Sequence, residues 1–142
     1  MLESESVAQR VRSAGYAMTR PRQAVVDAVR NQPSQFTAND VYAAIQEATP
    51  DVGRATVFRT IELLERVGVV CRVHSREGCA TYTCCTQLQH HHHLVCSSCG
   101  EVIEIPGCGL SDLIQSAWAQ HGFEVEGHVV EIYGRCRTCQ SA

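Results

Sequence analysis

The chain has no lysine and no long apolar run. All twelve basic side chains are arginine, and each planar guanidinium can grip a phosphate or a guanine edge through two hydrogen bonds. An arginine-rich proteome would produce the same bias. No segment approaches about 18 uninterrupted apolar residues, and the opening MLESESVAQR lacks a basic stretch followed by an apolar one. We therefore expect a cytoplasmic protein that does not contact a membrane.

Catalytic zinc motifs are missing as well. Neither H-E-x-x-H nor H-x-E followed by P-C-x-x-C occurs in the sequence. A catalytic zinc also needs an open coordination position with a general base beside it. The sequence predicts that the protein is not an enzyme, and a zinc-dependent hydrolase is the remote alternative.

Cysteine, in contrast, is abundant, with nine residues in a chain of 142. Cytosolic thiols are kept reduced, and an odd number of cysteines cannot pair completely. We therefore expect metal ligation or thiol chemistry, and not disulfide bonds, to account for most of them.

Apolar residues recur at every third or fourth position between Val7 and Val67, which predicts four helices. Thr19, followed by a first-turn proline, is expected to cap the second helix, and Thr37 the third. The fourth helix is expected over residues 54–67, with one apolar face directed at a core.

After Gly68 the pattern changes to β-branched runs at residues 69–73 and 80–83, joined by a turn at 75–78. Helices followed by a hairpin are typical of a winged helix. The remainder predicts a strand over 94–105, a helix over 110–121 and a strand over 125–133. The predicted fold class is α+β, an N-terminal winged-helix DNA-binding domain followed by a small α/β dimerisation domain. Its predicted divisions are residues 1–85, a hinge at 86–89, and a zinc-binding domain at 90–142.

Two C-x-x-C motifs give the strongest chemical signal. Each can present two thiolates, and four thiolates complete a tetrahedral structural zinc site. The ligands are Cys96, Cys99, Cys136 and Cys139. Two unrelated thiol pairs or a redox motif are the alternatives.

Four consecutive histidines, residues 90–93, precede the first of these motifs. In an extended segment, alternate side chains share a face, so His91 and His93 form one ligand pair and His90 and His92 another. A solvated polar linker is the alternative reading.

Cysteines are the expected partners of the first histidine pair. Cys84 and Cys85 end the predicted hairpin and Cys71 lies on the opposing strand. A shell of sulfur and nitrogen favours zinc over iron or manganese. His128 is the candidate partner of His90 and His92, with a surface histidine as the alternative. Cys79 and Cys108 have no partner by spacing and are interpreted as spare thiols.

These segments resemble the Fur (ferric uptake regulator) superfamily of bacterial metal-dependent repressors, and most of all its zinc uptake regulators. The resemblance covers nearly the whole chain. The matching segments are Thr19–Arg22, Arg54–Thr60, His90–Gly100 and His128–Cys139.

The resemblance implies a homodimer that binds operator DNA through its fourth helix. The implied DNA-contacting residues are Arg54, Thr56, Phe58 and Arg59. It also implies a sensory metal site at the hinge, which includes His91 and His93, and a further site with His90, His92 and His128.

Several departures from the family pattern bear on the metal. Gln35 replaces the histidine that iron and peroxide sensors place before the third helix. Cys85 matches the sensory cysteine of zinc uptake regulators, with Cys84 as a rival, and Cys71 falls where those regulators carry an aspartate. Ser111 occupies the position of the glutamate expected at the further site.

The sequence thus predicts a zinc-responsive repressor with a structural and a regulatory zinc. The sensory ligands are expected to be Cys71, Cys85, His91 and His93. The partner is double-stranded operator DNA, an inverted repeat that matches the two-fold symmetry of the dimer. An iron- or peroxide-responsive regulator of the same fold is the alternative.

Overall fold

The structure, a computed structural model, describes residues 4–74, 78–86 and 90–141. Two compact units divide the chain, Met1–Thr86 and Gln87–Ala142. The predicted turn at 75–78 and hinge at 86–89 lie outside the described residues except for Gly78 and Thr86. Within the described ranges, no helix has the length and apolar character to cross a membrane.

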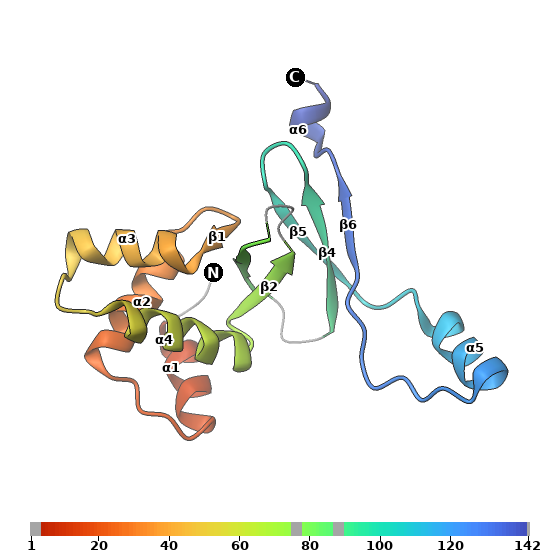
Figure 1. Cartoon of the computed structure of the whole chain (residues 1–142), viewed down its shortest axis with the longest axis horizontal. Helices are drawn as coiled ribbons and strands as arrows, with labels where there is room; N and C mark the ends of the chain where they lie inside the picture. Colours follow the sequence, from red (N-terminus) through yellow and green to blue (C-terminus); the bar gives the residue numbers. More distant parts are fainter. Residues whose placement is uncertain (1–3, 75–77, 87–89, 142) are drawn as a thin grey trace. The chain divides into compact units, whose positions relative to one another are not determined.

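The first unit has the helix-rich order of a winged helix (Figure 1). Its elements are α1 (Ser4–Ser13), α2 (Arg20–Arg30), β1 (Phe36–Thr37), α3 (Ala38–Ala48), α4 (Arg54–Arg66), β2 (Val70–His74) and β3 (Ala80–Cys84). The strands form an antiparallel sheet in the order β1-β3-β2. The four predicted helices and the hairpin are confirmed, whereas β1, only two residues long, was not predicted from the sequence.

Local chemistry sets the helix starts. The Thr19 hydroxyl accepts a hydrogen bond from the Arg22 backbone N–H at 3.4 Å. Thr37 and Asp40 form a reciprocal capping box at the start of α3. Both predicted caps are therefore confirmed, whereas α4 begins after Gly53 without a side-chain cap.

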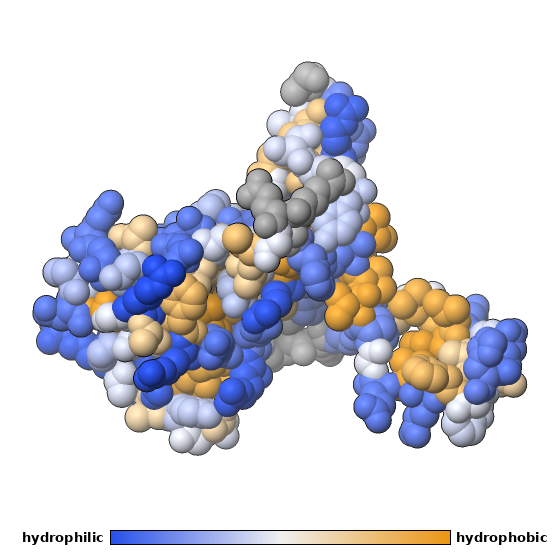
Figure 2. Space-filling model, viewed as in Figure 1, coloured by the Kyte–Doolittle hydropathy of each residue, from blue (hydrophilic) through white to orange (hydrophobic). Residues whose placement is uncertain are grey.

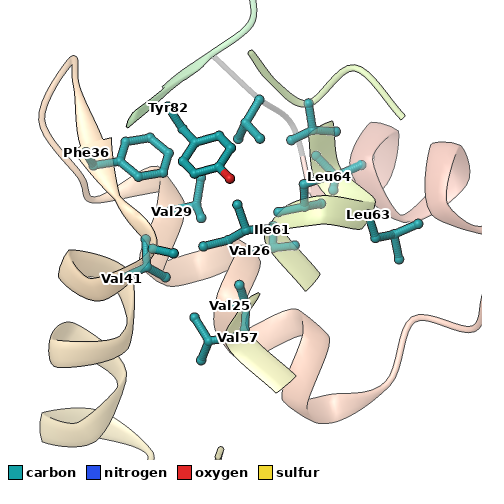
Figure 3. Close-up of a cluster of buried hydrophobic side chains, with 14 of the residues drawn as sticks. Val25, Val26, Val29, Phe36, Val41, Val57, Ile61, Leu63, Leu64 and Tyr82 are labelled. Carbon is teal, nitrogen blue, oxygen red and sulfur yellow. The ribbon is translucent and has the colours of Figure 1, made fainter. Parts of the chain in front are cut away.

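One hydrophobic core organises the first unit (Figure 3). Val57, Ile61 and Leu64 on α4 are at most 1% exposed, and they pack with residues of α2, α3 and the sheet. Because the apolar stripe of α4 is used in this way, its Arg54 and Arg59 side chains remain exposed.

The second unit is built on a three-stranded sheet. Its elements are β4 (His91–Cys96), β5 (Val102–Pro106), α5 (Ser111–His121), β6 (Glu131–Gly134) and α6 (Arg137–Gln140). The central strand β4 is antiparallel to β5 and parallel to β6.

Two predicted strands of this unit were wrong in extent. The strand expected over 94–105 is instead β4 and β5, because the chain reverses between them. A hydrogen bond that the Cys96 N–H donates to the Glu101 carbonyl at 2.8 Å closes the turn. Gly100 in this turn has a φ of 76°, a conformation that glycine adopts without strain. The strand expected over 125–133 begins only at Glu131, and the short helix α6 was not predicted.

Few side chains are buried in the second unit. Among its described residues these are His92, His93, Val95 and Cys96. No residue of α5 is buried, and Trp118 on this helix is 63% exposed. Figure 2 shows apolar surface over this helix. The unit therefore lacks a hydrophobic core comparable to that of the first unit.

Candidate metal centres

The parallel pairing of β4 with β6 brings the two C-x-x-C motifs together. Cys96 is aligned with Gly134, so the segments that follow both strands emerge at the same end of the sheet. The Ser97 N–H donates to the Gly134 carbonyl at 2.7 Å and fixes this end. Cys136 then serves as the N-cap residue of α6, which carries Cys139.

The four sulfur atoms lie within 4.8 Å of one another. They belong to Cys96, Cys99, Cys136 and Cys139. Sulfurs around a tetrahedral zinc lie about 3.8 Å apart, because each Zn–S bond is about 2.3 Å long. Cys99 Sγ and Cys136 Sγ are 3.8 Å apart, so the donor set fits a tetrahedral metal site.

Hydrogen bonds inside this cluster shift thiol pKa values in opposite directions. The backbone N–H of Cys136 donates to Cys96 Sγ at 3.3 Å and is the main cause that lowers the pKa of Cys96 to about 6. Side-chain hydrogen bonds with Cys136 and Cys99 raise the pKa of Cys139 to about 12. Ionising all four sulfurs at neutral pH therefore requires a compensating cation.

At the other end of the sheet, the histidine run separates into two sets. The rings of His90 and His92 lie 4.6 Å apart, and those of His91 and His93 lie 5.0 Å apart, measured between centroids. The alternation predicted from the sequence is therefore confirmed.

The first set has a member that the sequence did not reveal. His90, His92, Cys108 and His128 place their donor atoms within 4.8 Å of one another. Cys108 follows β5, whose end lies beside the start of β4 because the two strands are antiparallel. Spacing gave Cys108 no partner, whereas the structure places its sulfur 3.2 Å from His128 Nε2. Only the β4–β5 reversal reveals this neighbour.

The second set also gains an unforeseen member. Glu104 on β5 pairs directly with His93 on β4, and a Glu104 carboxylate oxygen joins His91 and His93 within 4.8 Å. Burial, followed by the neighbouring His91, lowers the pKa of His93, which favours the neutral ring that ligates metals.

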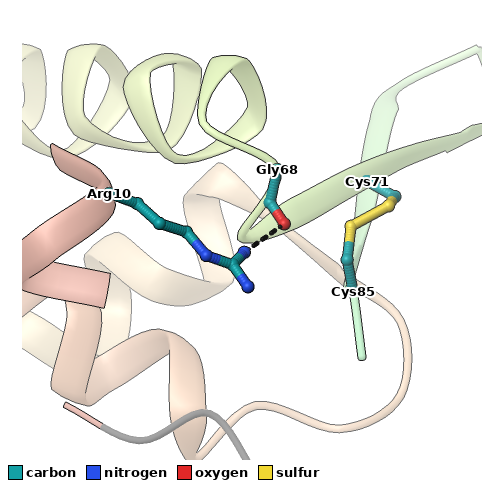
Figure 4. Close-up of a disulfide and its surroundings, with 4 residues drawn as sticks. All are labelled: Arg10, Gly68, Cys71 and Cys85. Atoms are coloured by element: carbon teal, nitrogen blue, oxygen red, sulfur yellow. Dashed lines mark hydrogen bonds between the residues drawn. A yellow bond between two sulfur atoms is a disulfide. The ribbon is translucent and has the colours of Figure 1, made fainter. Parts of the chain in front are cut away.

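In the first unit, Cys71 and Cys85 form a disulfide (Figure 4). Cys71 lies on β2, and Cys85 follows β3, where its N–H donates to the Val69 carbonyl at 3.0 Å. The expectation of reduced thiols differs from the structure at this pair, because the hairpin brings the two Cα atoms to 5.7 Å. Nearby, Arg10 Nη1 donates to the Gly68 carbonyl at 2.9 Å and ties α1 to the hairpin.

The rival cysteine, Cys84, has a different environment. Its sulfur lies 3.9 Å from the Val29 carbonyl oxygen, and its side chain packs against the hydrophobic core. Cys71 lies opposite Thr83 on β3, and Cys84, the next residue, points to the opposite face of the sheet. Cys85, one residue further on, is the one bonded to Cys71.

The four residues predicted to contact DNA all lie on α4. Arg54 and Arg59 are exposed, whereas Thr56 and Phe58 are half-buried. The Arg54 guanidinium carbon lies 4.9 Å from the centre of the Phe58 ring, so Phe58 supports Arg54 as well as packing on the core.

A winged-helix unit joined to an α/β unit rich in cysteine and histidine is an architecture typical of metal-responsive transcriptional regulators. The profile of the ferric uptake regulator family matches residues 13–133. The ferric uptake regulation protein of Bacillus subtilis (strain 168) is 32% identical over 138 residues, covering 95% of this chain and 93% of that protein.

Two solved structures extend the comparison. A zinc uptake regulator in complex with zinc and DNA has a TM-score of 0.75 and 27% identity, covering 96% of this chain and 94% of that one. The ferric uptake regulator of Vibrio cholerae has a TM-score of 0.61 and 30% identity, covering 90% of this chain and 98% of that one. The chain belongs to the ferric uptake regulator family. It is thus a transcriptional regulator and not an enzyme, and the predicted fold class is confirmed.

Replacement of Cys139 by serine tests the four-cysteine centre. We expect the variant to lose one metal ion per chain and the ordered structure of the second unit, because this unit has few buried side chains to hold it otherwise. Elemental analysis measures the metal, and circular dichroism with light scattering reports on folding and mass. Cys79→Ser, at an exposed free cysteine, is the control, and full metal content with an unchanged spectrum in Cys139→Ser would contradict the assignment.

Proposed function

We propose that the protein is a zinc-responsive repressor that binds operator DNA as a homodimer in the bacterial cytoplasm. The observation that carries this proposal is the ligand chemistry of the chain, in which cysteine sulfur and histidine nitrogen outnumber carboxylates at the candidate metal centres. Such donors favour zinc over iron or manganese. The likeness to a zinc uptake regulator in complex with zinc and DNA supports the same reading.

Recognition of DNA is assigned to α4 and the arginines around it. Ten arginines and nine acidic residues lie in residues 1–85, whereas residues 86–142 have two arginines and six acidic residues. The net charge of −3 is therefore carried mainly by the second unit, and the first unit is close to neutral. The proposed recognition helix has exposed guanidinium groups. Attraction to phosphate must come from these groups, so binding weakens as salt rises.

Dimerisation is assigned to the second unit because its apolar surface is uncovered. Leu94 pairs with Ile103 on one side and Ile132 on the other, which forms an apolar row across the sheet. Ile103 and Ile132 are 46% and 53% exposed, and Leu113 on α5 is 65% exposed. A second copy of the chain can bury this surface, and its symmetry suits an inverted-repeat operator.

Sensing is assigned to Cys71, Cys85, His91 and His93. The first unit contributes two sulfurs already held together by its hairpin, and the second contributes two imidazoles from one face of β4. Coordination by ligands from both units would restrict their relative orientation, and zinc would then favour the arrangement that fits the operator. Only the reduced cysteine pair offers thiolates, so the response requires a thiol reductant.

An iron- or manganese-responsive regulator is the second candidate, and one observation favours it. Glu104 lies beside His91 and His93, and a carboxylate oxygen is a donor that these metals prefer. This candidate uses the histidines without the cysteines, whereas a zinc sensor uses both.

Replacement of Arg59 by alanine tests the recognition helix. We expect affinity for an operator, selected from random duplexes with the zinc-loaded protein, to fall about tenfold or more, since a specific base contact contributes about 1–3 kcal/mol. Arg66→Ala removes an equal charge from the last turn of the same helix and serves as the control. Fluorescence anisotropy over a range of salt concentrations is the measurement. Equal affinities of the two variants would contradict the assignment of Arg59 to DNA recognition.

Replacement of Cys85 by serine and of His91 by alanine tests the sensory assignment. We expect both variants to keep the zinc of the four-cysteine centre but to lose zinc-dependent operator binding, because each lacks one regulatory ligand. Cys79→Ser should respond as the unchanged protein does. Operator binding is titrated with zinc, iron(II) and manganese(II) in the presence of reductant.

The same titration separates the two candidate functions. If Cys85→Ser still responds to zinc, the cysteine is not a sensory ligand. If that variant responds to iron or manganese and His91→Ala does not, the protein is the iron- or manganese-responsive regulator instead.

A further inference from the structure

The guanidinium group of Arg54 lies over two aromatic rings at the start of the proposed recognition helix. Its central carbon is 4.9 Å from the centre of the Phe58 ring and 5.8 Å from the centre of the Tyr42 ring. Tyr42 belongs to α3, outside the helix to which DNA recognition is assigned, and the resemblance implied no role for it. We propose that Tyr42 is a positioning residue for sequence recognition, which together with Phe58 holds Arg54 in the orientation that reads a guanine.

The connection between α3 and α4 explains how one arginine meets two rings. Phe58 follows Arg54 by four residues, so the two side chains share a face of α4. Two hydrogen bonds brace the connection: the Val52 N–H donates to the Thr49 carbonyl at 3.1 Å, and Gln46 Nε2 donates to the Val52 carbonyl at 3.1 Å. This short, braced segment fixes where α4 begins relative to the aromatic residue on α3.

The two rings are anchored in the first unit, whereas the arginine is not. Tyr42 and Phe58 are half-buried and pack against the hydrophobic core, and Arg54 is exposed. Val41 and Ile45, which flank Tyr42 on α3, are at most 2% exposed. Rings fixed in this way restrict the arginine that lies over them. A long side chain that is already restricted loses less conformational entropy when it binds a partner.

Contact with a ring uses none of the N–H donors of a guanidinium group. Other arginines of the first unit spend these donors inside the protein, as Arg72 does when it donates to both carboxylate oxygens of Glu65 at 3.2 Å. In the part of the chain that the structure describes, no carboxylate forms an ion pair with Arg54. Its donors are therefore available to an acceptor on another molecule.

The position of Arg54 favours a base over a phosphate as that acceptor. Arg54 is the first residue of α4, and the first residues of a recognition helix contact base edges in the major groove. The O6 and N7 atoms of guanine match two N–H donors of a guanidinium group, and a pair of such fixed geometry rewards a fixed side chain. The proposal rests on the assignment of DNA recognition to α4, and not on which metal activates the protein.

Modified bases test the proposal. An operator is selected from random duplexes with the full-length protein, loaded with whichever of zinc, iron(II) and manganese(II) supports binding. Each guanine of the half-site is then replaced in turn by 7-deazaguanine, which lacks the N7 acceptor. We expect one guanine whose replacement weakens binding of the unchanged protein about fivefold or more. The same replacement should have no effect on binding by Arg54→Ala, because the side chain that reads N7 is absent.

Variants of Tyr42 then separate positioning from packing. Tyr42→Leu keeps apolar bulk against the core but has no aromatic face, whereas Tyr42→Phe keeps the face. We expect Tyr42→Leu to reduce the discrimination against 7-deazaguanine about two- to fivefold, the size of an exposed cation–π contact. Tyr42→Phe should discriminate as the unchanged protein does. The discrimination is a ratio of affinities for two duplexes, so a partial loss of folded protein cancels.

Arg59 provides an internal control for these variants. Among the described residues it has no cation–π contact with a ring. Base preferences that are lost in Arg59→Ala should therefore be the same in Tyr42→Leu as in the unchanged protein.

The proposal fails if Tyr42→Leu discriminates against 7-deazaguanine as strongly as the unchanged protein does. It also fails if Arg54→Ala weakens binding equally to every duplex, because Arg54 would then contact phosphate alone. Neither result bears on whether zinc is the effector, since the metal is chosen by its effect on binding. Failure of this proposal is thus distinguishable from failure of the proposed function.

Discussion

The parallel pairing of β4 with β6 is the constraint on which the metal chemistry of the second unit depends. Because the strands run in the same direction in a fixed register, the residues before them meet at one end and those after them at the other. One register thus aligns His128 with the histidine run and Cys136 with Cys96. A shift of one residue would disrupt both donor sets at once.

This arrangement compensates for a small hydrophobic core. The first unit buries a continuous cluster of apolar side chains, whereas the second buries few side chains, two of which are histidines. A unit of this size needs another source of stability, and metals or a partner subunit are the usual ones. In our account, ligand bonds at the ends of the sheet replace core packing, and the exposed face of sheet and helix is left for a second copy of the chain.

Sequence reasoning succeeded where the signal is local. Helix periodicity, the Thr19 and Thr37 caps and the pairing of alternate histidines follow from spacing alone, and the structure agrees. It failed where the outcome depends on chain reversal: Cys108 and Glu104 join their histidines only because β5 folds back on β4. The resemblance to known regulators anticipated the overall fold, but Cys108 is not among the ligands that it implied.

The disulfide between Cys71 and Cys85 could not be read from composition either. An odd number of cysteines suggested free thiols, and the pair arises because the hairpin holds the strand β2 beside the residue that follows β3. The same proximity that permits a disulfide would let both thiolates bind one ion when reduced. Redox state and metal response are therefore linked at this position in our account.

The most direct test of the account is a crystal structure of the reduced, zinc-loaded protein with anomalous diffraction measured at the zinc edge. The account predicts two separate zinc peaks, a structural one bound by Cys96, Cys99, Cys136 and Cys139 and a regulatory one bound by Cys71, Cys85, His91 and His93. Two results would contradict the claim that the β4–β6 register assembles a structural metal site. One is a four-cysteine cluster without zinc, and the other is a cluster whose cysteines are joined as disulfides.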